Sequence, residues 1–174
     1  HLLFVLCLVF IAGGRQRLIL TVTGFTVAHS ITLALSTLHL VNLNIAGVEA
    51  VIALSIVFLA TEIAKDKHST ITWRYPMSVA IIFGLLHGFG FATVLNEIGL
   101  PQTELATGLL FFNLGVEIGQ LLFIGCVMVV LFLFKRLCGT KSIRYQAIYN
   151  KFTAYAIGTV SAFWLFERSI NSLI

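Results

Sequence analysis

Long apolar stretches separated by short polar gaps run through the whole chain. Six of them have the pattern of helices, at about residues 1–12, 17–38, 44–64, 76–96, 104–134 and 149–171. Most are close to the roughly 20 residues that cross a bilayer core. The first is too short to span, so we expect this helix to begin upstream of His1. The fifth is longer than a bilayer needs and must tilt, project or break near Gly115 and Gly119.

The charged residues lie mainly in the gaps between the apolar stretches. Ten of the 11 Lys and Arg residues fall in the first, third and fifth gaps, with Arg168 as the exception. The second gap has no Lys or Arg, and the fourth is acidic. Cytoplasmic loops of membrane proteins carry an excess of Lys and Arg. We therefore predict that the odd-numbered gaps are cytoplasmic and that the N-terminus and the C-terminus both lie outside.

Composition agrees with this pattern, since 59% of the residues are hydrophobic and only 10% are charged. We predict an all-α integral membrane bundle of about six transmembrane helices, forming a single transmembrane domain over residues 1–174. The net charge of +4 comes from loop residues, so no nucleic-acid partner is expected. The cysteines Cys7, Cys126 and Cys138 have no metal-ligand spacing and are interpreted as free thiols.

Polar residues interrupt the fifth apolar stretch near its middle. Asn113, Glu117 and Gln120 fall on one helix face at about 100° per residue. A carboxylate at that depth is costly, and it almost always has a partner or lies in a water-filled cavity. The other groups that could meet it from within apolar stretches are few: His1, His29, Glu49 and His87.

The predicted topology places these groups by depth. His29, His87 and Glu117 fall near the membrane midplane, and His1 and Glu49 nearer the outer surface. Two pairs of glycines have the four-residue spacing of close helix packing, Gly84 with Gly88 and Gly115 with Gly119. Packing at these glycines would bring His87 and Glu117 together.

A weak internal repeat relates two parts of the chain. The segments FTVAHS at 25–30 and FGLLHG at 83–88 share Phe, His and a small residue at matching positions. Each is followed on the next helix by Gly-Val-Glu, at 47–49 and at 115–117. The helices match in direction, so a duplication would be a parallel repeat.

Imidazole and carboxylate groups together suit a borderline divalent ion such as Ni, Co, Zn or Cu(II). A site for passage should be incomplete, because the ion must leave as well as bind. We therefore predict a metal site of His1, His29, Glu49, His87 and Glu117, with Asn113 and Gln120 as supporting residues. Each of these side chains has an alternative role as a hydrogen-bonded packing residue.

Several blocks of sequence resemble the signature blocks of the HupE/UreJ membrane proteins. In order they are FTVAHSITL at 25–33, VEAVIALS at 48–55, HGFGFA at 87–92 and FNLGVEIGQ at 112–120. HLLF at 1–4 is similar to the second half of an Asp-His pair that opens the first helix in one branch, and WLFER at 164–168 to a closing block. The resemblance implies six or so transmembrane helices in the bacterial inner membrane, and a link to nickel or cobalt handling for hydrogenase and urease maturation.

Three functions remain open on these grounds. The leading hypothesis is a secondary permease or metal-binding membrane protein for a divalent transition metal, Ni or Co, with Zn or Cu as alternatives. No Walker-type loop is present, so nothing indicates ATP use. The alternatives are a membrane-embedded metalloenzyme, and a non-catalytic membrane subunit whose His/Glu cluster fixes helix packing. Expected partners are the lipid bilayer, the metal ion, and a second copy of the chain or an accessory protein.

Overall fold

The computed structural model describes residues 1–41, 43–98, 104–138 and 142–173, and the side chains of these residues except 92–98, 135, 138, 142–147 and 173. Within these ranges the chain is helical with short connections and no strand. The helices are α1 (Leu2–Ile11), α2 (Arg15–Thr37), α3 (Ile45–Lys65), α4 (Ile71–Arg74), α5 (Pro76–Ile98), α6 (Leu105–Cys138) and α7 (Ser142–Leu173). The predicted all-α fold is confirmed.

Two elements differ from the expectation. The one-turn helix α4 was not predicted. It ends at Arg74, because Tyr75 precedes a proline and the residue before a proline disfavours the helical conformation. Pro76 then starts α5, where its missing N–H costs nothing. Helix α7 begins at Ser142 instead of near residue 149, because hydropathy marks only the apolar part of a helix that also includes the more polar residues 142–148.

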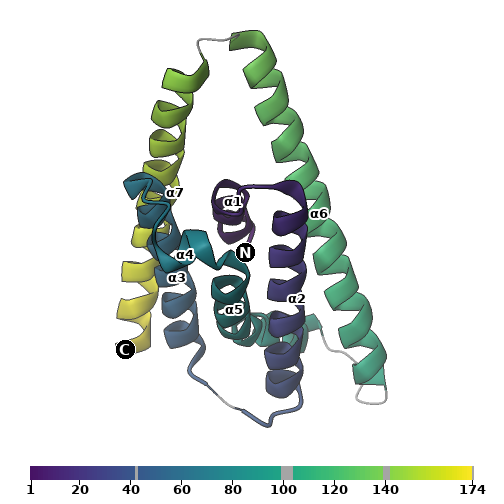
Figure 1. The fold of residues 1–174 in the computed structure, drawn as a ribbon. Coiled ribbons are helices and arrows are strands. Elements are labelled where there is room, and N and C mark those ends of the chain that lie inside the picture. The colour runs from purple at the N-terminus through teal and green to yellow at the C-terminus, as the bar shows by residue number, and fades with distance from the viewer. Residues whose placement is uncertain (42, 99–103, 139–141, 174) are drawn as a thin grey trace.

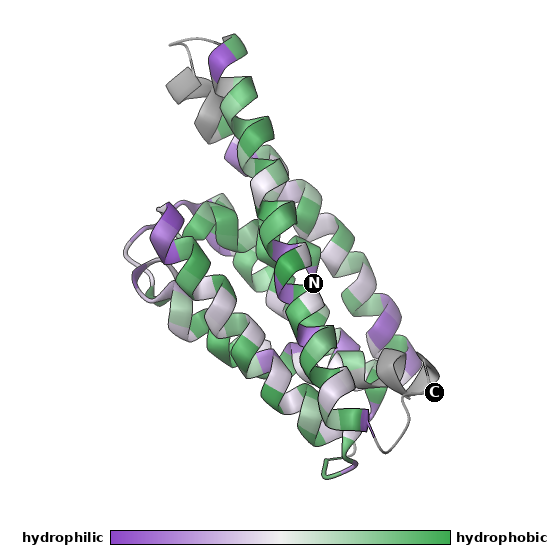
Figure 2. Ribbon diagram, turned by 90° about the vertical axis from the view of Figure 1, so that its right-hand side faces the viewer, coloured by the Kyte–Doolittle hydropathy of each residue, from purple (hydrophilic) through white to green (hydrophobic). Residues whose placement is uncertain are grey.

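Three helical segments are long and apolar enough to cross a membrane: Arg15–Thr37, Ile45–Lys65 and Leu105–Phe134. The described parts of α1 and α5 are shorter apolar helices. The helices are largely apolar, with hydrophilic residues at the loops and helix ends and a few within the helices (Figure 2). On α6, for example, Leu122 is 67% exposed and Phe132 is 61% exposed. Such a surface suits lipid and not water, which supports a membrane bundle.

The long fifth stretch is resolved without a break. Helix α6 runs continuously over 34 residues, or about 51 Å at 1.5 Å per residue. It is tilted with respect to α2, and α6 and α7 project together beyond the other helices (Figure 1). Gly115 and Gly119 lie inside the unbroken helix. The excess length is therefore accommodated by tilt and projection.

The most extensive helix contacts are between α2 and α5 and between α3 and α7, with the short α1 among them (Figure 1). Helices α2 and α5 run in the same direction, as a parallel repeat requires, although the repeat itself stays a prediction. The starts of α2 and α5 are tied together, because the Arg17 guanidinium donates to the carbonyls of Trp73 and Arg74. The first and third basic gaps thus lie at one end of the bundle.

The glycines of α5 explain its close approach to α2. A Cβ built at Gly84 would lie 2.6 Å from the carbonyl oxygen of Phe25. A Cβ at Gly88 would overlap the His29 carbonyl oxygen and the Thr32 hydroxyl. Only glycine permits this backbone-to-backbone contact.

The glycines of α6 have a different environment. A Cβ at Gly115 or Gly119 would meet no atom within 4 Å. The expectation that the two glycine pairs pack against each other is therefore wrong, since the α5 pair faces α2. Cys7 and Cys126 are free thiols, as expected, whereas the Cys138 side chain and Lys141 lie outside the described residues.

Candidate metal centre

Three histidines from three helices meet inside the bundle. His29 on α2 and His87 on α5 are fully buried, and His1 at the start of α1 lies against both. The His1 Nε2 atom is 3.3 Å from His29 Nδ1. The ring centroid of His1 is 4.9 Å from that of His29 and 4.8 Å from that of His87. We call these three residues the histidine cluster.

Backbone packing brings the two buried histidines into this cluster. His87 directly precedes Gly88, whose backbone rests against the His29 carbonyl. His1 was expected nearer the outer surface. It lies instead with His29 and His87, because the first turn of α1 lies between the helices that carry these two residues (Figure 1).

Phenylalanine rings surround the histidine cluster. Phe4 and Phe25 lie with their centroids 4.7 Å and 5.2 Å from that of His87. Phe91 lies 4.3 Å from His1 and 5.4 Å from His29, measured between centroids. The polar ring nitrogens thus sit in apolar surroundings, where an unpaired polar atom is costly.

The hydrogen bonds of Ser55 assign the protons on His87. The Ser55 hydroxyl donates its proton to the Ile52 carbonyl at 2.6 Å. Its oxygen lies 3.0 Å from His87 Nε2, so it accepts a hydrogen bond from the N–H of that nitrogen. In the neutral imidazole this leaves a lone pair on His87 Nδ1.

That lone pair has no partner. His87 Nδ1 and His29 Nε2 are both buried, and neither has a hydrogen bond within the described structure. Buried polar atoms are normally paired, and an exception in a native structure needs an explanation such as an absent ion. A histidine that binds a metal usually donates its other N–H to a fixed acceptor, as His87 does to Ser55.

The cluster is open and not a closed coordination site. Among the side chains that the structure describes, no three His, Cys, Asp or Glu residues are arranged to hold a metal ion. The His1 Nε2 and His29 Nδ1 atoms share a hydrogen bond of 3.3 Å, so one of these two nitrogens carries the proton and the other accepts it. The cluster thus offers two unpartnered imidazole nitrogens, one on His29 and one on His87, as an incomplete set of ligands.

The two predicted carboxylates lie elsewhere. Glu117 on α6 is half-buried, and its Oε1 atom accepts a hydrogen bond of 3.0 Å from the Thr23 hydroxyl. Thr23 precedes His29 by six residues on α2, a rise of about 9 Å. Over the described ranges, no hydrogen bond or ion pair joins Glu117 to a histidine. The expected contact of Glu117 with His87 is not formed.

The supporting residues Asn113 and Gln120 also lie on α6. Gln120 accepts a hydrogen bond of 3.0 Å from the Thr26 hydroxyl, and its buried Nε2 has no partner. Asn113 donates to the Leu109 carbonyl of its own helix at 2.9 Å, which leaves its Oδ1 buried and unpaired. Helices α2 and α6 thus share a polar seam, defined by the pairs Thr23–Glu117 and Thr26–Gln120.

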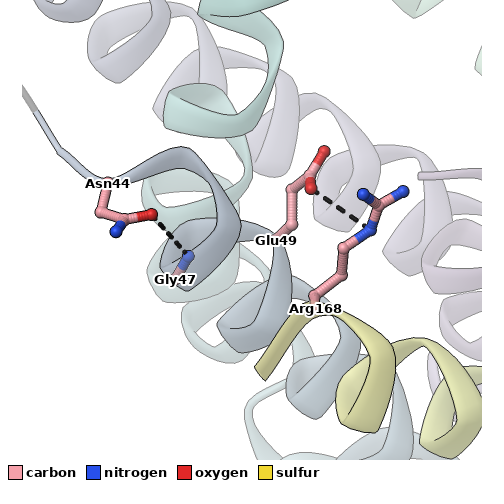
Figure 3. Close-up of polar contacts among 4 residues, drawn as sticks. All are labelled: Asn44, Gly47, Glu49 and Arg168. Carbon is pink, nitrogen blue, oxygen red and sulfur yellow. Dashed lines mark hydrogen bonds and ion pairs between the residues drawn. The ribbon is translucent and has the colours of Figure 1, made fainter. Parts of the chain in front are cut away.

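Glu49 has a partner of opposite charge. Near the N-terminal end of α3, its Oε2 atom lies 3.3 Å from the Arg168 Nε atom on α7 (Figure 3). Both side chains are partly exposed, at 35% for Glu49 and 42% for Arg168. In the same view, the Asn44 side chain accepts a hydrogen bond from the Gly47 amide and caps α3. The structure therefore places Glu49 in an ion pair that ties α3 to α7.

Three residues that contact these sites could not be identified from the sequence: Ser55, Thr23 and Thr26. Ser and Thr are frequent in transmembrane helices, where most bond to a carbonyl of their own helix. Thr37 does so, for example, at 2.9 Å from the Leu33 carbonyl. Nothing local in the sequence distinguishes a hydroxyl of that kind from one that also reaches another helix.

Known proteins match the chain at the level of a family. No curated protein and no solved structure matches the chain. A family model described as HupE / UreJ protein matches residues 1–168, which include the histidine cluster, the polar seam and the Glu49–Arg168 pair. The family is associated with nickel or cobalt transport or accessory function. The chain belongs to the HupE/UreJ family.

Proposed function

We propose that the protein is a secondary permease for a divalent transition-metal ion, nickel or cobalt, in the bacterial cytoplasmic membrane. The histidine cluster is its cargo site. The observation that carries this proposal is the buried His87 Nδ1 atom, which has no hydrogen-bond partner in the described structure and lies beside two further histidines. Imidazole suits nickel and cobalt, whereas oxygen-only sites suit magnesium and calcium.

The open geometry of the histidine cluster favours transport of the ion and not its permanent binding. An ion in transit must bind well enough to enter and weakly enough to leave. The cluster supplies nitrogens without a complete coordination shell, so water would complete it. In this proposal the ion enters from the end of the bundle opposite the basic gaps and leaves toward the basic, cytoplasmic end.

The carboxylates have separate roles in this proposal. Glu117, in the polar seam, binds the ion after the histidine cluster, because its partner Thr23 lies nearer than His29 to the basic end of α2. An ionisable group inside a span marks an ion path. Gln120 and Asn113 each keep a buried polar atom free on the same helix and would support it. Glu49 gives less support, because Arg168 already neutralises its charge.

The test is nickel and cobalt binding by the detergent-purified protein, comparing wild type with His87→Gln and Ser55→Ala. The glutamine keeps a nitrogen donor near the position of Nε2 for Ser55 but has no counterpart of the Nδ1 lone pair. We expect His87→Gln to lose metal while it stays folded, and Ser55→Ala to retain most of it. Wild type without affinity for either ion would overturn the proposal.

A second candidate, a non-catalytic membrane subunit, is favoured by the His87–Ser55 hydrogen bond, which links α5 to α3. In that case the histidines serve helix packing alone. Wild type and His87→Gln would then both lack metal, and Ser55→Ala would destabilise the protein as much as His87→Ala does. Thermal unfolding of the same variants distinguishes this function from the permease.

A further inference from the structure

A cavity of about 660 Å³ opens between α1, α6 and α7, toward the basic end of the bundle. It is separate from the histidine cluster and from the polar seam. Its walls are mainly apolar, with Val9 and Phe10 from α1 and Val129 and Phe132 from α6. Arg15, at the start of α2, lines it as its one charged residue among those described.

The charge at this cavity is not balanced by the protein. Arg15 is exposed, and within the described residues no carboxylate pairs with it. Arg17, two residues on, is instead engaged with the carbonyls of Trp73 and Arg74. On α7, Tyr149 and Asn150 line the cavity, and the exposed Lys151 follows them. The site therefore combines an apolar interior with free positive charge.

The surrounding helices leave this volume open to the bilayer. Helices α6 and α7 diverge around α1 and make little direct contact with each other along the described residues (Figure 1). Val129 is 56% exposed, so its side chain is available to a molecule in the cavity. The volume lies within the roughly 300–1,000 Å³ that is typical of ligand sites.

We propose that this cavity binds an anionic phospholipid, with an acyl chain between α6 and α7 and the headgroup phosphate at Arg15. The apolar walls match an acyl chain, and guanidinium pairs well with phosphate. Basic pockets between transmembrane helices near the cytoplasmic surface attract anionic lipids. The cavity has no His, Cys or carboxylate lining among the described residues, so it does not suit a metal ion.

The first arm of the test measures the headgroup. Native mass spectrometry of the detergent-purified protein records retained lipid after incubation with phosphatidylglycerol or with phosphatidylcholine of the same acyl chains. We expect about fivefold stronger retention of phosphatidylglycerol, in line with one basic residue near a surface phosphate. Arg15→Gln should remove this preference, and Lys67→Gln, a loop charge away from the cavity, should leave it unchanged. Equal retention of both lipids by wild type would overturn the proposal.

The second arm measures the cavity itself. Val129→Trp fills part of the volume and should reduce retention of both lipids, whereas Val130→Trp, on the neighbouring exposed position outside the lining, should not. Equal loss in the two tryptophan variants contradicts a lipid in this cavity. A dimer without bound lipid that Val129→Trp disrupts and Val130→Trp does not would also contradict the proposal, because a second copy of the chain would then occupy the cavity. His87→Gln should retain lipid normally, which separates this inference from the metal proposal.

Discussion

Helices α5 and α6 both pack against α2, and both carry two glycines four residues apart beside a polar residue, yet their interfaces differ. On α5, Gly88 touches the backbone of α2, and His87 is fully buried. On α6, Gly119 faces open space, and Glu117 reaches α2 only through the Thr23 hydroxyl. The same spacing of small residues thus accompanies a tight contact in one place and a loose, polar one in the other.

The difference shows what glycine spacing does in a membrane helix. It permits close approach, but the opposite surface decides whether the approach occurs. For α5 that surface includes Ala28, a small side chain 3.1 Å from a Cβ built at Gly84. The α6 glycines are exposed, so the face of α6 that carries them is open to lipid. The four predictions that follow test this contrast, beginning with the largest effect.

The first prediction compares the polar residues of the two helices. If the tight interface holds the cargo site, His87→Gln should weaken nickel or cobalt binding about 100-fold, or by about 2.7 kcal/mol. Glu117→Gln should weaken it about tenfold or less, because Glu117 lies outside the histidine cluster. Isothermal titration of the purified variants measures both constants. A larger loss of affinity for the ion in Glu117→Gln than in His87→Gln would mean that the cargo site is the polar seam.

The second prediction compares the glycines. Gly88→Ala should destabilise the protein by about 1–3 kcal/mol, since the new methyl group overlaps the His29 carbonyl and overpacks the interface. Gly119→Ala should be neutral or stabilise by up to about 1 kcal/mol, because alanine favours the helix and meets nothing there. Unfolding in mixed detergent gives both values. Shifts of the same sign and size would mean that the two interfaces are equivalent.

The third prediction concerns the polar seam alone. Thr23→Val keeps the shape of the side chain but removes the hydrogen bond to Glu117. Hydrogen bonds between membrane helices contribute about 0.6 kcal/mol on average. We expect a loss of that order in the same unfolding assay. Thr159→Val is the matched control, since the exposed Thr159 bonds only within its own helix, and it should have no measurable effect.

The fourth prediction concerns the Glu49–Arg168 ion pair, which joins α3 to α7 and lies outside the interfaces of α5 and α6 with α2. A double-mutant cycle with Glu49→Gln and Arg168→Gln should give a coupling of about 0.2–1 kcal/mol, as for other partly exposed pairs. The coupling should shrink as salt is added, because screening weakens exposed pairs. Metal binding by Glu49→Gln should match that of wild type. A clear loss of metal binding would mean that Glu49 belongs to the cargo site.

Much of the fold could be predicted from the sequence. Hydropathy predicted the positions of the helices, because the backbone of each apolar stretch must form its hydrogen bonds within the stretch itself. Its side chains then face lipid or other helices. It could not find α4, a single turn placed by Pro76, or the start of α7 in polar sequence. The basic gaps predicted which loops lie together, and for the first and third gaps Arg17 confirms it.

The candidate site was predicted less completely. Spacing along one helix shows which residues share a face, as for Glu117 and Gln120, but not which neighbour that face meets. The neighbour depends on the packing of the whole bundle. Here it turned the α5 glycines toward α2, and with them His87 toward His29, while the α6 carboxylate met a threonine. The Arg168 partner of Glu49 was missed for the same reason, being 119 positions away.

The contact of Gly88 with the His29 carbonyl has a consequence for selectivity. Because main-chain atoms meet there, the two helices that carry the buried histidines cannot come closer together. Tight packing transmits strain instead of absorbing it. In the proposed cargo site, the two buried histidines could then adjust to a smaller ion only by turning their side chains.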